Sequence, residues 1–174
     1  MRVQISLTCL IASFLIVSSS WAGLDEGIKA LDNGNTLTAT NEFTSLAEQG
    51  SADGQYYLGR LYQLDSTATS RRLAVIWLKK AAEQGHTEAQ GFLASQYASG
   101  FGVDKDLVLA YKWYSLAAQN SKIDAMMRDS LKAEMSSAQL ARANNMVIDW
   151  QEAHADQPIY HEVDNLEKYL VLSE

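Results

Sequence analysis

The chain has 174 residues, of which 14 are basic and 21 acidic, giving a formal net charge of −7, and it contains one cysteine. An acidic chain is repelled by phosphate backbones and by anionic lipid surfaces, so the composition argues against nucleic acid as a partner. A single cysteine cannot form an internal disulfide, and the stability of the fold must therefore come from packing.

The first 22 residues have the pattern of a secretory signal peptide. Arg2 gives a positive start, an apolar run covers residues 5–17, and small residues precede a predicted cleavage after Ala22. The run is shorter than the roughly 20 residues that a membrane-crossing helix needs. We therefore expect export to the periplasm or beyond, with no stable membrane insertion after cleavage. Cleavage also removes Cys9, and with it any thiol chemistry.

A repeat organises the chain that follows. The string LAEQG at 46–50 recurs as AAEQG at 81–85, and AAQNS stands at 117–121. Apolar positions recur in step with these strings. The recurring positions are Ala39, Ala74 and Ala110, then Leu58 and Leu93, Tyr62 and Tyr97, and Trp77 and Trp113. Each unit predicts two helices, whose apolar faces can be buried only by stacking on neighbouring units.

Expected helix boundaries recur at the same phase. A residue type that favours the N-cap stands four positions before each repeated alanine and predicts the start of the second helix of each unit. These residues are Asn35, Ser70 and Asp106. An acidic residue is expected at one shared position in the first turn of each first helix, where the helix dipole favours negative charge. These residues are Asp53, Glu88 and Asp124. Gly50 and Gly85 predict helix ends.

The segment AQGFLASQYASGFGVDKDLVLAYKWYSLAAQNS at 89–121 resembles a Sel-one-like repeat, a relative of the tetratricopeptide repeat. It follows the pattern A-x-x-x-L-G-x-x-Y-x-x-G-x-G-V-x-x-D-x-x-x-A-x-x-W-Y-x-x-A-A, with Ala94 in place of one glycine. The unit at 54–85 departs in its loop, where LDSTATS replaces the glycine-containing turn. Residues 24–50 resemble an opening unit. Residues 122–153 resemble a closing helix pair, in which Ser136 and Gln139 suggest a capping box.

This resemblance implies an all-α fold, a right-handed α-solenoid of about four antiparallel helix pairs over residues 23–153. It also implies a protein that binds a protein partner, as a scaffold or regulator in a cell-envelope assembly, without enzymatic activity and without a cofactor. Residues 154–174 lie outside it. Pro158 breaks the preceding helix. A short amphipathic helix is then expected, which caps the stack or docks on a partner; its apolar residues are Val163, Leu166, Tyr169 and Leu170.

The predicted binding surface is the concave face made by the first helix of each pair. On the helix of the second unit, Tyr56, Arg60 and Gln63 share one side, opposite Leu58. The corresponding residues of the later units extend this surface. They are Gly91, Ser95, Met127 and Leu131. An aromatic and a basic residue beside a patch of small residues suit a peptide or a helix. An ordinary solvated surface is the other interpretation.

Two other classes of protein stay open. An enzyme that hydrolyses wall sugars needs paired carboxylates; Asp104 and Asp106 lie close in sequence, but capping explains Asp106 better. A module that binds a glycan or a small molecule needs aromatic residues outside the repeat phase, and Tyr56, Tyr57 and Trp150 are the candidates. The three histidines lack the spacing of metal ligands, and no metal site is expected.

Overall fold

A computed structural model describes residues 22–155, and all regular secondary structure within them is helical. Residues 22–32 are helical, and seven helices follow. They are α2 (Thr36–Glu48), α3 (Ala52–Leu64), α4 (Ala68–Glu83), α5 (Thr87–Ser99), α6 (Leu107–Ala117), α7 (Lys122–Lys132) and α8 (Ser137–Ala153). The all-α prediction is confirmed. Residues 1–21 of the predicted signal peptide and the tail helix predicted after Pro158 lie outside the described residues.

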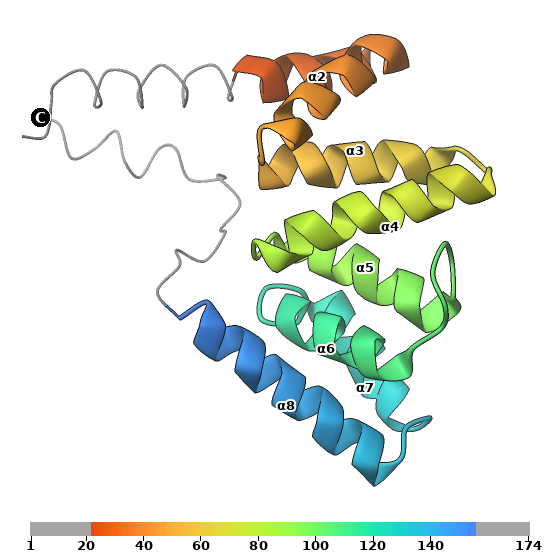
Figure 1. Cartoon of the computed structure of the whole chain (residues 1–174), viewed down its shortest axis with the longest axis vertical. Coiled ribbons are helices and arrows are strands. Elements are labelled where there is room, and N and C mark those ends of the chain that lie inside the picture. The colour runs from red at the N-terminus through yellow and green to blue at the C-terminus, as the bar shows by residue number, and fades with distance from the viewer. Residues whose placement is uncertain (1–21, 156–174) are drawn as a thin grey trace, which may run out of the picture.

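The helices are stacked along the long axis of the molecule, from α2 at one end to α7 and α8 at the other (Figure 1). Helix 22–32 packs against α2 around Phe43 and forms an opening unit with it. Helices α3 with α4 and α5 with α6 form two complete units. We call the leading member of each later pair (α3, α5 and α7) a first helix, and α2, α4, α6 and α8 second helices. None of the helices within residues 22–155 has both the length and the apolar character needed to cross a membrane.

Buried alanines and leucines from successive units form the core. Leu78 of α4 and Leu93 of α5 are fully buried in the larger cluster, which also contains Trp113. A smaller cluster around Phe43 and Leu58 joins the opening unit to the second unit. Because each unit contributes to the burial of its neighbours, the core is continuous along the stack rather than confined to one pair of helices.

Close approach of helices depends on residues without large side chains. A β-carbon at Gly59 of α3 would lie 2.9 Å from the Leu78 side chain, so α3 and α4 pack nearly in backbone contact there. In the loop between α5 and α6, Gly102 has φ of +78°. A β-carbon on Gly102 would lie 2.5 Å from the Arg71 carbonyl oxygen, so both the backbone angle and the space require glycine.

The predicted N-caps are correct at two positions and wrong at one. Asn35 caps α2 and Asp106 caps α6, but the N-cap of α4 is Thr67. The Thr67 hydroxyl accepts from the Ser70 backbone N–H at 3.1 Å, while the Ser70 hydroxyl donates to Asp65 at 2.6 Å. This polar loop stands where the next unit has a glycine-containing turn. It lets α4 begin three residues earlier than the repeat phase predicted.

The phase of α7 also differs from the prediction by one residue. Gly50 and Gly85 have φ of +91° and +88° and each precedes a helix-capping residue. Ser121 aligns with these glycines in the repeated strings, yet its φ is −131° and it is itself the N-cap of α7. The first helices are therefore capped at a constant spacing of 35 residues. Their N-caps are Ser51, His86 and Ser121.

The closing helices do not repeat the packing of the interior pairs. Both α7 and α8 pack against α6, and α8 begins with the predicted capping box of Ser136 and Gln139. At its other end α8 reaches back to the turn between α4 and α5. There the His154 Nε2 atom lies 3.0 Å from the Glu83 carbonyl oxygen, and the Trp150 ring faces Gly85.

Candidate functional site

Five of the seven predicted binding residues have side chains that reach the surface. Tyr56, Arg60 and Gln63 are half-buried on α3, whereas Ser95 and Met127 are exposed on α5 and α7. The other two are internal. Gly91 is buried, and a β-carbon there would lie 2.8 Å from a carboxylate oxygen of Asp124. Leu131 is 8% exposed and belongs to the core.

The position of Leu131 follows from the one-residue shift of α7. Counted from its N-cap, Leu131 occupies the position of Gln96 in α5, which is also buried, and not that of Arg60. The residue equivalent to Arg60 and Ser95 is Ser130, which is exposed. The assignment of Leu131 to an accessible surface was therefore wrong. The N-cap and the packing of a helix decide which of its sides is buried. Aligning repeated sequence strings across a turn determines neither the cap nor the packing.

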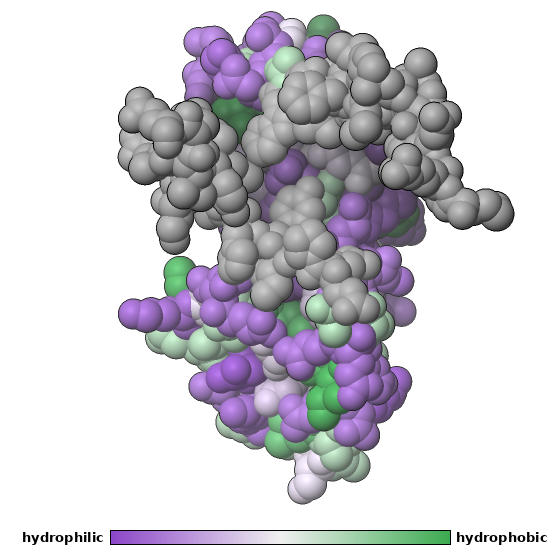
Figure 2. Space-filling model, turned by 90° about the vertical axis from the view of Figure 1, so that its left-hand side faces the viewer, coloured by the Kyte–Doolittle hydropathy of each residue, from purple (hydrophilic) through white to green (hydrophobic). Residues whose placement is uncertain are grey.

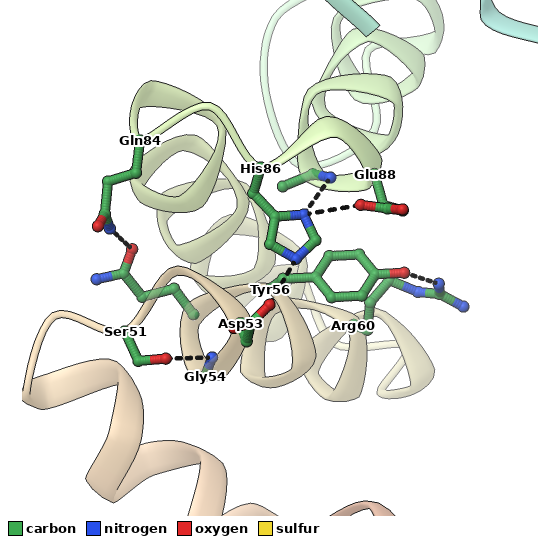
Figure 3. Close-up of polar contacts among 10 residues, drawn as sticks. Ser51, Asp53, Gly54, Tyr56, Arg60, Gln84, His86 and Glu88 are labelled. Carbon is green, nitrogen blue, oxygen red and sulfur yellow. Dashed lines mark hydrogen bonds and ion pairs between the residues drawn. The ribbon is translucent and has the colours of Figure 1, made fainter. Parts of the chain in front are cut away.

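Tyr56 and Arg60 of α3, His86 at the N-cap of α5 and Phe92 of α5 form an aromatic–cationic cluster. Figure 3 shows Tyr56, Arg60 and His86. Arg60 donates from Nη1 to the Tyr56 hydroxyl at 3.0 Å. Its guanidinium carbon lies 4.0 Å from the centroid of the Phe92 ring, a distance typical of a cation–π interaction. These contacts orient the Arg60 side chain, and neither neutralises its charge.

His86 ties the two complete units together. It is 6% exposed, and its ring stacks on Tyr56 with centroids 4.5 Å apart. Its Nδ1 atom accepts from the Ala89 backbone N–H at 3.3 Å, so it serves as the N-cap of α5. The Nε2 atom lies 3.4 Å from Asp53 of α3, and Nδ1 lies 3.2 Å from Glu88 (Figure 3).

The two carboxylates control the ionisation of His86. Burial of the ring lowers the pKa, but hydrogen bonds and charges from Asp53 and Glu88 outweigh burial, so the pKa of His86 is raised above its ordinary value of 6.5. In the same arrangement, the hydrogen bond from His86 lowers the pKa of Glu88. Protonated His86 can donate to both carboxylates, and it then gives up the bond from the Ala89 N–H.

A buried glutamine recurs beside this cluster. Gln55 of α3 donates from Nε2 to the Ala47 carbonyl at 3.3 Å, and Gln90 of α5 donates in the same way to the Ala82 carbonyl at 3.2 Å. Each bond joins a first helix to the second helix of the preceding unit. The sequence showed that Gln55 and Gln90 match, but not their role. The structural role of His86 was missed because histidine is an uncommon N-cap.

The methionine face lies on α7 and comprises Ile123, Met126 and Met127. Their exposed fractions are 68%, 70% and 47%, and their spacing of i, i+3 and i+4 places them on one side of the helix. Counted from the N-cap, Ile123 and Met126 occupy the positions of Asp53 and Tyr56. In α3 those two residues contact the next first helix through His86. The methionine face thus presents, at the end of the stack, the side that earlier units use to contact the following unit.

The remaining candidate residues have structural contacts. Tyr57 stacks on Phe43 with centroids 4.8 Å apart, and the Trp150 ring stacks on His154 at 4.0 Å and packs against the core. Asp106 accepts from the backbone N–H groups of the first turn of α6, whereas Asp104 is exposed. Within residues 22–155 no group of three or more His, Cys, Asp or Glu residues is arranged to hold a metal ion.

Figure 2 shows the face of the molecule from which the described chain leaves α8. In the lower part, which contains the closing helices, hydrophobic residues are exposed between hydrophilic ones. A contiguous patch of exposed apolar residues is typical of a contact surface, whereas single scattered apolar residues are common on any protein surface.

Comparison with known proteins gives the same repeat units. The Sel1 repeat family matches residues 52–86 and 87–122, which correspond to the two complete helix pairs. No curated protein matches the chain.

Among solved structures, the chain is similar to a protective antigen, present in uropathogenic Escherichia coli strains, that displays an SLR fold. The TM-score is 0.70 at 24% sequence identity, and the match covers 83% of this chain and 34% of that protein. The chain therefore spans about a third of the length of this structural relative, and the likeness concerns the fold.

Proposed function

Because the chain is a Sel1-repeat solenoid, we propose that it binds a protein partner through the methionine face of α7. Sel1 repeats are typically a non-catalytic fold for protein interaction. In this proposal the chain is exported and acts as a scaffold or regulator in a cell-envelope assembly. The sequence pattern of residues 1–22 supports export.

The observation that carries the proposal is the exposure of Ile123, Met126 and Met127 on one side of α7. Burying a large apolar side chain from water contributes about 1.5–3 kcal/mol. An interior unit obtains this by stacking, as Leu93 does in α5. Leaving three such side chains in solvent sacrifices this contribution in the isolated chain, whereas a partner that covers them recovers it.

The chemistry of this face favours an amphipathic helix as the partner's contact element. The equivalent side of α3 faces a helix, because Tyr56 contacts the Phe92 ring of α5 with centroids 6.0 Å apart. The exposed side of α7 is therefore suited to contact with a helix. Methionine side chains are flexible and polarisable, and adapt to an apolar stripe of varied shape. Charged residues of both signs surround this face: Arg128 and Lys132 each lie 2.9 Å from the Asp129 carboxylate. Such a polar margin is typical of a protein interface.

A photocrosslinking experiment in the producing cells tests the proposal. A diazirine amino acid replaces Met127 in one strain and Ile76 in the other. Ile76 lies on α4 and is 49% exposed, against 47% for Met127, so the probes are equally accessible. We expect one defined protein adduct from position 127, identified by mass spectrometry, and none from position 76.

The same adduct from both positions, or none from position 127, would contradict partner binding at the methionine face. A carbohydrate adduct would favour a glycan-binding module instead. Export is tested separately, because cleavage after Ala22 gives an intact mass for the exported chain that begins at Gly23.

A further inference from the structure

We propose that residues 156–174 of this chain dock on the aromatic–cationic cluster and cover it. This inference concerns a different surface from the methionine face, and it rests on the proposed function only in treating the chain as a binding protein. The argument uses the end point of α8, the chemistry of the cluster and the sequence of residues 156–174.

The C-terminal end of α8 lies beside the cluster. The His154 ring bonds to the Glu83 carbonyl through Nε2 and lies close to the Trp150 carbonyl oxygen through Nδ1, at 3.0 and 2.7 Å. His154 also stacks on Trp150, which faces Gly85. Gly85 directly precedes His86, the central ring of the cluster. The last described turn is therefore fixed one residue from the cluster, where a following segment has little chain entropy to lose on docking.

The following segment is long enough to cross the cluster. Residues 156–174 number 19, and 19 extended residues reach about 60 Å, or about 29 Å if helical. Helix α3 has 13 residues and is therefore about 20 Å long. Either conformation passes Tyr56 and Arg60 from the end of α8.

The segment is complementary to Arg60 and Phe92 of the cluster, whereas the Asp53 and Glu88 carboxylates face His86. Residues 156–174 contain five acidic residues and one lysine, and their apolar residues include Val163, Leu166 and Leu170. In the cluster, the Arg60 charge is oriented by a hydroxyl and an aromatic ring, and within the described residues no carboxylate lies within ion-pair distance of it. An acidic and apolar segment can pair with Arg60 and cover the Phe92 ring at once.

Other molecules that could cover the cluster predict different crosslinks from those of the segment. An external partner or a second copy of the chain would make intermolecular contacts with the cluster. The segment itself makes intramolecular ones, with no dependence on protein concentration. If the segment docks, the cluster becomes an intramolecular contact, and the methionine face is the surface that stays open to partners.

The test places photo-leucine at Leu166 or at Leu170 in the full chain and reads the crosslinks by peptide mapping. We expect intramolecular links from at least one position to residues 52–64 or 87–99, at the same yield over a hundredfold range of protein concentration. Arg60→Glu is expected to reduce that yield at least threefold. Ile76→Glu, a charge introduced at an exposed position on α4, is expected to leave it unchanged.

Water adducts without internal links at both positions, links to a second molecule, or links spread evenly over all helices would each overturn the proposal. Circular dichroism of the Arg60→Glu chain shows that a loss of links is not a loss of fold. Partner capture by position 127 is independent of these probes. A failure of the segment to dock would therefore leave the proposed function standing, and the converse also holds.

Discussion

The interior units and the closing helices use the same repeat differently. In α3 and α5 the capped first helix buries its apolar residues and donates a glutamine bond to the preceding unit, and His86 joins α3 to α5. In α7 the cap is retained, but only Leu131 is buried, and three large apolar residues face solvent. Local capping thus fixes where a helix starts, whereas burial of its outward side depends on a following unit.

The largest expected contrast comes from removing apolar side chains in the two regions. Leu78→Ala, at a fully buried position in α4, is expected to lower the free energy of unfolding by about 2–5 kcal/mol, because it loses buried surface and leaves a cavity. Met127→Ala on α7 is expected to change it by less than about 0.5 kcal/mol. Urea unfolding followed by circular dichroism measures both. Equal losses would show that Met127 is buried in solution.

A second contrast concerns glycines with similar backbone angles. Gly102 and Gly34 have φ of +78° and +73°. Alanine at either position has a left-handed cost of about 1–2 kcal/mol. Only Gly102→Ala also drives a β-carbon against the Arg71 backbone, whereas nothing lies within 4 Å of a β-carbon at Gly34. We expect the melting temperature to fall further for Gly102→Ala. Equal falls would mean that the α5–α6 loop moves freely away from Arg71.

The glutamine bond between units is expected to have an intermediate effect. Gln90→Met keeps the length of the side chain but removes one of two hydrogen bonds to the Ala82 carbonyl, which also accepts from the Gly85 N–H at 3.0 Å. Loss of one such bond costs about 0.5–1.5 kcal/mol. Gln119→Met, at an exposed position after α6, is the matched control and is expected to be nearly neutral. Chemical denaturation of both variants decides the point. If Gln90→Met leaves the free energy of unfolding unchanged, this bond does not contribute to joining the units.

The smallest expected effect is a pH dependence located at the joint between the complete units. Because the folded-state pKa of His86 is raised, its stabilising contribution is fully present below pH 6.5 and is lost as the pH rises through the higher folded-state pKa. His86→Ser keeps an N-cap oxygen, as Ser51 and Ser121 supply in the other first helices. The stability advantage of the wild-type chain over this variant should shrink from pH 5.5 to pH 8.5, measured by urea unfolding at each pH.

The other histidines are common to both proteins and cancel in that difference. An advantage that is constant or grows with pH would contradict the pairing of protonated His86 with Asp53 and Glu88. The lowered pKa of Glu88 acts at the opposite end of the range, because its contribution is lost as the pH falls below 4.5. The two groups are therefore separable by pH.

The sequence predicted the helical fold and most of its caps, because each repeated residue has a local physical role. Asn35 and Asp106 cap helices, Gly50 and Gly85 take left-handed angles, and Trp113 is buried in the core as its repeat phase indicated. The start of α4 was predicted wrongly, since Thr67 and Asp65 form a local polar network that the repeat pattern does not contain.

The candidate site was predicted only in part. Tyr56 and Arg60 share a surface and contact each other, as their spacing of four residues indicated. The placement of Leu131 failed because α7 is shifted by one residue after a turn without glycine. The contacts of Tyr56 and Arg60 with His86 and Phe92 join different helices, and such packing cannot be read from spacing within one helix.

Binding of a partner at the methionine face is the central claim, and the affinity of the purified chain for the protein captured at position 127 tests it most directly. We predict that Met126→Glu with Met127→Glu raises Kd at least tenfold, because charges replace apolar contacts at the centre of the interface. Ile76→Glu, a charge introduced at comparable exposure on α4, should change Kd by less than twofold. Equal affinities for the wild-type chain and both variants would contradict the claim.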